Sequence, residues 1–179
     1  MKKWIDVKWC VPLLAILLFY VVLKGKGQVP TMLILRLVLL AIGFAAAYVD
    51  WKEKRVPNRL VAGFALAWLL ILAPLVLYDP NAAISIGVNG VIGFVISAVV
   101  LLAVYVISRK GLGGGDVKLM SVAGLYLGYD GALSALLYGS VLSALTAIVL
   151  ILRKKMTAKD SIPLVPFLYI GILITEFFR

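Results

Sequence analysis

Two aspartates lie where long apolar runs meet short polar loops. A carboxylate beside hydrocarbon costs free energy, so its presence there suggests a function. Asp50 closes one apolar run and is followed by the polar segment 51–58, WKEKRVPN. Asp116 follows the glycine string 111–115, GLGGG, and opens another apolar run. Two carboxyl groups that share one site can hold one proton between them, because both ionise together only at a cost. Such a pair could activate a water molecule and hydrolyse a buried peptide bond.

The composition is that of a membrane protein. The chain has 179 residues, of which 64% are hydrophobic, and its mean hydropathy is +1.10, whereas a soluble domain is about 45–50% apolar. We expect a single transmembrane domain over residues 1–179, with no separate soluble domain. The net charge of +10 comes from bases in short loops between apolar runs. That distribution indicates membrane orientation and not nucleic-acid binding.

Several chemistries are excluded by residue type. The chain has no histidine, so it holds neither a Ser-His-Asp triad nor a histidine zinc site. Cys10 is the only cysteine, which excludes a disulfide within the chain and a cysteine metal cluster, and we expect it on ordinary helix surface. The glycine string is not a phosphate loop, because Leu119 and not Ser or Thr follows Lys118. It is not a dinucleotide fingerprint either, since Asp116 stands where glycine is needed.

Apolar runs define the expected elements. A membrane-spanning helix needs about 20 apolar residues, and seven runs come close to or reach that length, which predicts an all-α bundle of about seven transmembrane segments. The fifth run is short, and we expect it to be tilted or partly sunk in the bilayer. The first run is also brief. The seven runs are 9–23, 29–50, 59–78, 84–107, 117–128, 131–152 and 162–178.

Loop charge predicts the orientation of these segments. Bases cluster at the N-terminus and in the loops 50–59, 108–116 and 153–161, while the alternate loops carry Asp79 and Asp130. Cytoplasmic loops are enriched in Lys and Arg. Seven segments with the N-terminus inside therefore place Asp50 and Asp116 together on the cytoplasmic side. The loop with Lys24 and Lys26 is the exception.

Two further patterns predict helix packing. Arg36 lies inside the second run, where we expect it to snorkel or to pair with Glu176 of the last run. Small residues recur every four positions in the sixth run and predict close approach of another helix. They are Gly131, Ala135, Gly139, Ser143 and Ala147.

The glycines before Asp116 have a possible use of their own. Gly113, Gly114 and Gly115 permit backbone conformations barred to other residues and close approach to a substrate strand. An extended peptide inside a bundle needs partners for its own backbone. The alternative is a flexible loop with a helix-capping aspartate.

Three segments resemble the motifs of a known family, the type IV prepilin peptidases. Asp50 followed by residues 56–58, VPN, resembles the family's Asp and Ile-Pro-Asn. Residues 113–116, GGGD, resemble its Gly-x-Gly-Asp, and the longer run 111–120, GLGGGDVKLM, reads like the family's own sequence there. Residues 162–167, IPLVPF, resemble its Ile-Pro-Phe-Gly-Pro-Phe, with Leu-Val in place of Phe-Gly. The resemblance covers most of the chain.

The resemblance implies an intramembrane aspartyl peptidase with Asp50 and Asp116 as the catalytic pair and with no metal or cofactor. The implied substrate is a type IV prepilin, pseudopilin or archaellin precursor, whose basic leader is cleaved at the cytoplasmic face of the cell membrane. Which precursor is cleaved and the oligomeric state stay open. Supporting or substrate-binding roles are implied for Gly113, Gly114, Gly115, Lys118, Pro57, Asn58, Pro163 and Pro166.

Larger bacterial members of that family carry a cytosolic insert with paired cysteines and N-methylate the new N-terminus with S-adenosylmethionine. This chain has one cysteine, so we predict cleavage without methylation. Its basic loops should repel a basic leader, and anionic lipid headgroups are a candidate partner that would recruit it. The alternatives are a proton- or cation-coupled transporter that uses the same aspartates, and a scaffold that keeps the fold without activity.

Overall fold

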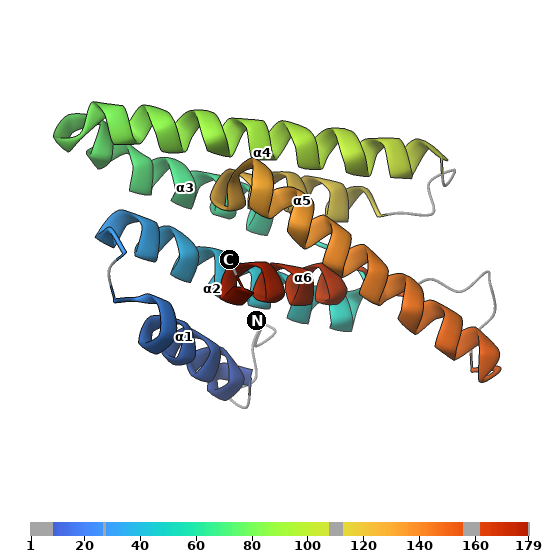
Figure 1. Ribbon diagram of the computed structural model, residues 1–179. Helices are drawn as coiled ribbons and strands as arrows, with labels where there is room; N and C mark the ends of the chain where they lie inside the picture. Colours follow the sequence, from blue (N-terminus) through green and yellow to red (C-terminus); the bar gives the residue numbers. More distant parts are fainter. Residues whose placement is uncertain (1–8, 27, 108–112, 156–161, 179) are drawn as a thin grey trace.

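The computed structural model describes residues 9–26, 28–107, 113–155 and 162–178, and the regular structure of these residues is all helical (Figure 1). Helices α2 to α5 are long and apolar enough to cross a membrane, whereas α1 and α6 are shorter apolar helices. This confirms the predicted all-α polytopic bundle. The described helices are α1 (Cys10–Lys24), α2 (Pro30–Glu53), α3 (Asn58–Tyr78), α4 (Pro80–Ile107), α5 (Gly114–Leu152) and α6 (Val165–Phe178).

Helix α5 is two helical segments joined at Gly128. This residue has φ 69° and ψ −178°, a region of backbone conformation that is open essentially to glycine alone. In Figure 1 the chain reverses direction there, so the second half of α5 runs back toward the end where the first half began. Asn89 of α4 accepts a hydrogen bond from the Tyr129 N–H, 3.1 Å away, just after the reversal. The fifth and sixth predicted segments are the two halves of α5.

Small residues let α6 approach the second half of α5 at backbone contact. A Cβ added to Gly171 would lie 2.3 Å from the Ala135 carbonyl oxygen, and one added to Gly139 would lie 2.8 Å from the Leu168 Cα. No side chain fits at such distances. Ala135 and Gly139 belong to the predicted small-residue stripe, and the structure confirms that this stripe serves helix packing.

A buried polar cluster ties four helices together away from the loops. Arg36 of α2 forms an ion pair with Glu176 of α6 and also donates to the Tyr126 carbonyl of α5, at 3.1 Å. The Tyr20 hydroxyl of α1 donates to Glu176 at 3.3 Å. The predicted pairing of Arg36 with Glu176 is confirmed. Cys10, at the start of α1, is exposed as predicted.

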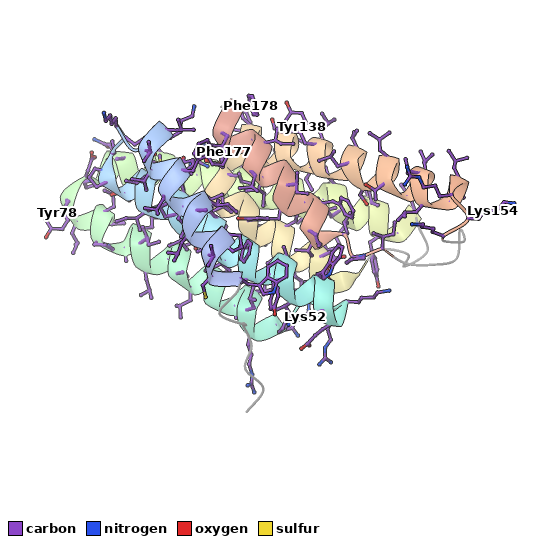
Figure 2. All side chains as sticks on the ribbon, turned by 90° about the horizontal axis from the view of Figure 1, so that it is seen from below. Lys52, Tyr78, Tyr138, Lys154, Phe177 and Phe178 are labelled. Atoms are coloured by element: carbon purple, nitrogen blue, oxygen red, sulfur yellow. The ribbon has the colours of Figure 1, made fainter. Side chains whose placement is uncertain are left out.

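The molecule has one strongly basic end. Helix α2 ends, and α5 and α6 begin, at the same end of the bundle (Figure 1). Figure 2 shows Lys154 at this end and Tyr78 at the opposite one. Exposed bases follow or begin the helices there: Lys52, Lys54, Arg55, Arg59, Lys118, Arg153, Lys154 and Lys155.

Candidate active site

Asp50 and Asp116 come together at the basic end of the bundle. Asp50 lies in the last turn of α2 and Asp116 in the first turn of α5. Both are buried, with exposed fractions of 3% and 9%. They are close enough for the charge of Asp50 to act on Asp116. The structure thus brings two buried carboxyl groups from distant parts of the chain to the same end of the bundle, and the loop-charge argument predicted a common end.

Asp50 is held by the start of α6. The backbone N–H of Val165, the first residue of that helix, donates to Asp50 Oδ2 at 3.2 Å. The first N–H groups of a helix have no partner inside the helix, and they favour an anion. Our sequence reasoning did not identify Val165 as a site residue. The signal was Pro166 directly after it, since proline is favoured in the first turn of a helix.

Asp116 fits where the neighbouring residues lack side chains. The backbone of Gly113 hydrogen-bonds the Asp116 carboxylate, and a Cβ on Gly113 would come within 3.0 Å of its Oδ2. A Cβ on Gly115 would lie 3.2 Å from Val56, a buried residue of the α2–α3 loop. These glycines therefore make room for the carboxylate and for the loop that covers it.

The expectation that Gly113, Gly114 and Gly115 adopt unusual backbone conformations is wrong. Gly113 has φ −71° and ψ 131°, which any residue adopts, and the next two glycines are helical. Among the described glycines, positive φ occurs at Gly128. Tight packing at the Gly113 and Gly115 Cα positions, and not left-handed backbone, accounts for glycine there, while Gly114 has open space around its Cα.

The other predicted site residues lie on the helices and loops next to the pair. The Lys118 ammonium donates to Asn58 Oδ1 at 3.4 Å and so links α5 to the start of α3. Pro57 is the residue directly before α3. Pro163 precedes α6, and Pro166 lies in its first turn. The supporting roles expected of these residues stay predictions.

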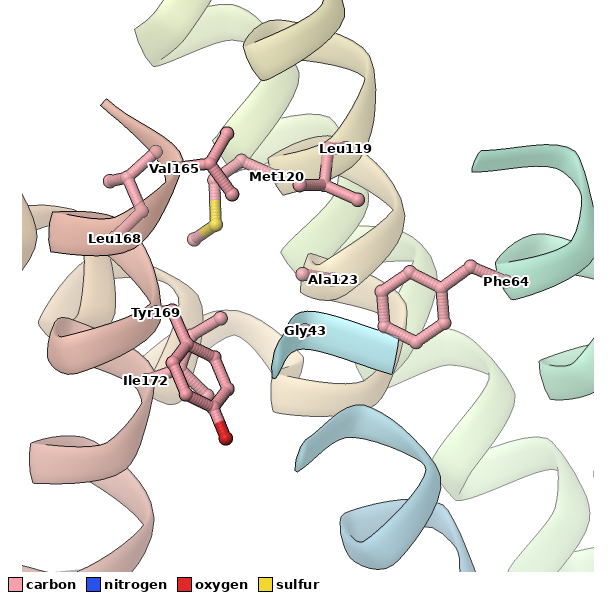
Figure 3. Close-up of a pocket in the computed structure, with 9 residues that line it drawn as sticks. All are labelled: Gly43, Phe64, Leu119, Met120, Ala123, Val165, Leu168, Tyr169 and Ile172. Carbon is pink, nitrogen blue, oxygen red and sulfur yellow. The ribbon is translucent and has the colours of Figure 1, made fainter. Parts of the chain in front are cut away.

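A small apolar cavity lies between the helices (Figure 3), and its lining includes Val165, whose N–H donates to Asp50. Its volume is about 10 Å³, and its lining includes Gly43, Phe64, Met120, Val165 and Tyr169, from four helices. A cavity of this size holds at most one water molecule. An extended peptide therefore does not fit in this cavity.

Metal ligands are not gathered at this site. In residues 9–26, 28–107, 113–155 and 162–178, no three or more Cys, Asp or Glu side chains are grouped so as to hold a metal ion. What the described residues offer is a carboxyl pair, two backbone donors and an apolar surrounding. This set can bind a water molecule and move protons.

The fold is that of a multi-pass helical membrane protein with a buried carboxyl pair at one end. Residues 37–148 match the sequence model of the type IV leader peptidase family, and the chain belongs to that family. The match includes both aspartates, whereas α1 and α6 lie outside it. No curated protein and no solved structure matches the chain. Family membership indicates a peptidase and favours it over a transporter.

Proposed function

We propose that the protein is an aspartic endopeptidase that removes the basic leader peptide from prepilin-like membrane precursors, with Asp50 and Asp116 as the catalytic pair. The observation that carries this proposal is the burial of both carboxyl groups at one end of the bundle, where the charge of Asp50 acts on Asp116. Family membership supplies the class of reaction, since the matched segment contains both residues.

The reaction follows from one proton shared by two carboxyl groups. The ionised carboxylate takes a proton from a bound water molecule, whose oxygen attacks the carbonyl carbon of the peptide bond. The protonated carboxyl donates its proton to the carbonyl oxygen and neutralises the charge that develops there. Collapse of the tetrahedral intermediate breaks the C–N bond, and the departing amine takes a proton from the pair. The water supplies one hydrogen to each product, and no redox partner is needed.

The cytoplasmic side of the membrane is the proposed location of the site. Most exposed bases of the described chain lie at the end that holds the carboxyl pair, with Lys26 of the α1–α2 loop as an exception, and Lys and Arg near transmembrane helix ends favour the cytoplasmic side. A cleavage site there is reached by a substrate whose leader has not crossed the membrane.

The test is co-expression with a precursor that carries a basic leader ahead of an apolar helix. We expect the wild-type protein to shorten the precursor, and Asp50→Asn or Asp116→Asn to leave it intact. Asp79→Asn is the matched control. Asp79 caps α4 by accepting from the Ala82 N–H at 3.0 Å, and asparagine caps equally well. Cleavage that persists in either variant of the carboxyl pair would contradict the catalytic assignment.

We also propose that the new N-terminus stays unmethylated, since the sequence has a single cysteine and only short loops between its apolar runs. Mass spectrometry of the shortened product, formed by the purified protein with added S-adenosylmethionine, tests this point. An unmodified amine is expected. A methylated amine would overturn this part of the proposal and leave the peptidase activity standing.

A further inference from the structure

An apolar groove opens beside the carboxyl pair on the lateral face of the bundle. Its volume is about 300 Å³, and we call it the lateral groove. Its two walls are the end of α2 and the start of α6, and Trp9, just before α1, lies at its edge. The other residues that line it are Phe44, Ala47, Tyr48 and Trp51 from α2 and Pro166, Tyr169 and Ile170 from α6.

The lateral groove is continuous with the site. Trp51 is the residue after Asp50, and Ala47 lies one turn before Asp50 on the same helix. On the other wall, Pro166 follows Val165, whose N–H holds the Asp50 carboxylate. The groove therefore starts at the depth of the carboxyl pair and extends along α2 and α6 away from the basic end.

Tyr169 lies between the lateral groove and the small cavity that Val165 also lines, because it lines both. Its hydroxyl donates to the Leu40 carbonyl of α2 at 3.1 Å. Its ring fits only because Gly43 has no side chain, since a Cβ there would lie 3.0 Å from the ring. One tyrosine thus stands between the lipid-facing surface and this small cavity.

Two interfaces near the pair are tightly packed. The second half of α5 and α6 meet at backbone contact around Gly171. Gly115, beside Asp116, is covered by Val56. The α2–α6 face differs, because its apolar side chains are open: Trp51 is 63% and Ile170 42% exposed. A membrane-embedded segment that reaches the carboxyl pair from the bilayer meets this face.

We propose that the lateral groove seats the apolar helix of the protein substrate, so that the peptide bond just ahead of that helix lies at Asp50 and Asp116. This inference rests on the proposed function. A helix lies in an apolar groove through side chains one turn apart, and the groove runs along α2 for about two turns, from Trp51 to Phe44. Its aromatic edge, Trp9 and Trp51, suits the interface between headgroups and hydrocarbon.

The inference also predicts where substrate preference lies. Pro166, Tyr169, Ile170 and Trp9 are outside the segment 37–148 that matches the family. One wall and the edge of the groove thus come from residues beyond the matched segment. Specificity for the apolar helix is expected to follow these residues, whereas the carboxyl pair sets the chemistry.

Site-specific photo-crosslinking directly tests whether the substrate's apolar helix binds in the lateral groove. A benzophenone amino acid is placed at Ile170 or at Trp51 in the Asp116→Asn protein, which is expected to hold the uncleaved precursor. The matched controls are Leu66 and Leu70 of α3, which are 55% and 64% exposed. We expect adducts with the precursor's apolar helix from the groove positions and not from the controls. Equal yields of adduct from the α3 positions would overturn the proposal. So would groove positions that crosslink only to lipid, to a second copy of the protein or to this chain's own N-terminus.

Filling the groove gives a second, independent measurement. Ile170→Trp should raise the KM for the full precursor about tenfold, equivalent to about 1.4 kcal/mol of binding, with kcat little changed. Leu70→Trp should match the wild type. An unchanged KM, or a fall in kcat alone, would overturn the proposal. The proposed function is tested by different outcomes. It is contradicted if the wild type cleaves no precursor, or if the variants of the carboxyl pair still cleave it.

Discussion

The backbone N–H of Val165 donates a hydrogen bond to Asp50 Oδ2 across 3.2 Å, although the two residues are 115 positions apart in the chain. Val165 begins α6, so this carboxylate lies at the positive end of a helix dipole. The contact orients one member of the carboxyl pair through the helix that also forms a wall of the lateral groove. Movement of α6 would therefore change both the position of the Asp50 carboxylate and the shape of the lateral groove.

Removal of this donor tests its part in the reaction. Val165→Pro deletes the N–H but suits the first position of a helix, where proline is favoured. A hydrogen bond to a charged group contributes about 1.5–3 kcal/mol, so we expect kcat for leader cleavage to fall about 10- to 100-fold. Val165→Ala keeps the donor and should retain activity within a few-fold. If both variants cleave equally, with equal thermal stability in detergent, the contact does not position Asp50 for catalysis.

The shared proton predicts how the rate depends on pH. At low pH both carboxyl groups are protonated, and no base accepts the water's proton. At high pH both are ionised, and no acid protonates the carbonyl oxygen. We expect the single-turnover cleavage rate in proteoliposomes to pass through a maximum, with the same profile for wild type and Asp79→Asn. A rate that rises with pH to a plateau would instead indicate a single base.

The Arg36–Glu176 pair is expected to matter for stability and not for chemistry. Arg36→Met would leave Glu176, which has a side chain only 3% exposed, buried without its cationic partner. Breaking a buried pair typically costs about 3–5 kcal/mol, and that loss is expected in unfolding measured in detergent.

A double variant, Arg36→Met with Glu176→Leu, provides the control for that prediction. It removes both charges and should recover part of the loss, because replacement of a whole buried pair by apolar side chains is often tolerated. Recovery should be incomplete, since Tyr20 and the Tyr126 carbonyl also lose a partner. A double variant less stable than Arg36→Met alone would contradict this account.

The sequence predicted the features that depend on local pattern. Apolar run lengths located the transmembrane segments, and loop charge placed Asp50 and Asp116 at one end. The Val165 contact was not predictable in this way, because it depends on how α6 packs against α2. The lateral groove likewise depends on side-chain packing between helices from opposite ends of the chain.

The glycines show that sequence pattern alone also fails to predict the structural role of single residues. Composition identified the string before Asp116 as important, but it could not separate backbone freedom from lack of volume. The structure assigns the packing role to Gly113 and Gly115 and the strained backbone to Gly128. The boundary between the predicted segments 117–128 and 131–152 located the reversal of α5, but the unusual backbone conformation of Gly128 was not predicted.

Two glycines in helix interiors give a matched test of the packing argument. Gly171→Ala would place a methyl group 2.3 Å from the Ala135 carbonyl oxygen, so α5 and α6 must separate, whereas a Cβ on Gly63 of α3 has nothing within 4 Å. We expect Gly171→Ala to lower the free energy of unfolding by about 1–3 kcal/mol. Gly63→Ala should be neutral or raise it by about 0.5–1 kcal/mol, through helix propensity alone. Thermal unfolding in one detergent compares the pair. Equal stability of the two variants would mean that α6 does not pack against α5 at backbone contact, and that the start of α6 is not fixed beside Asp50 in this way.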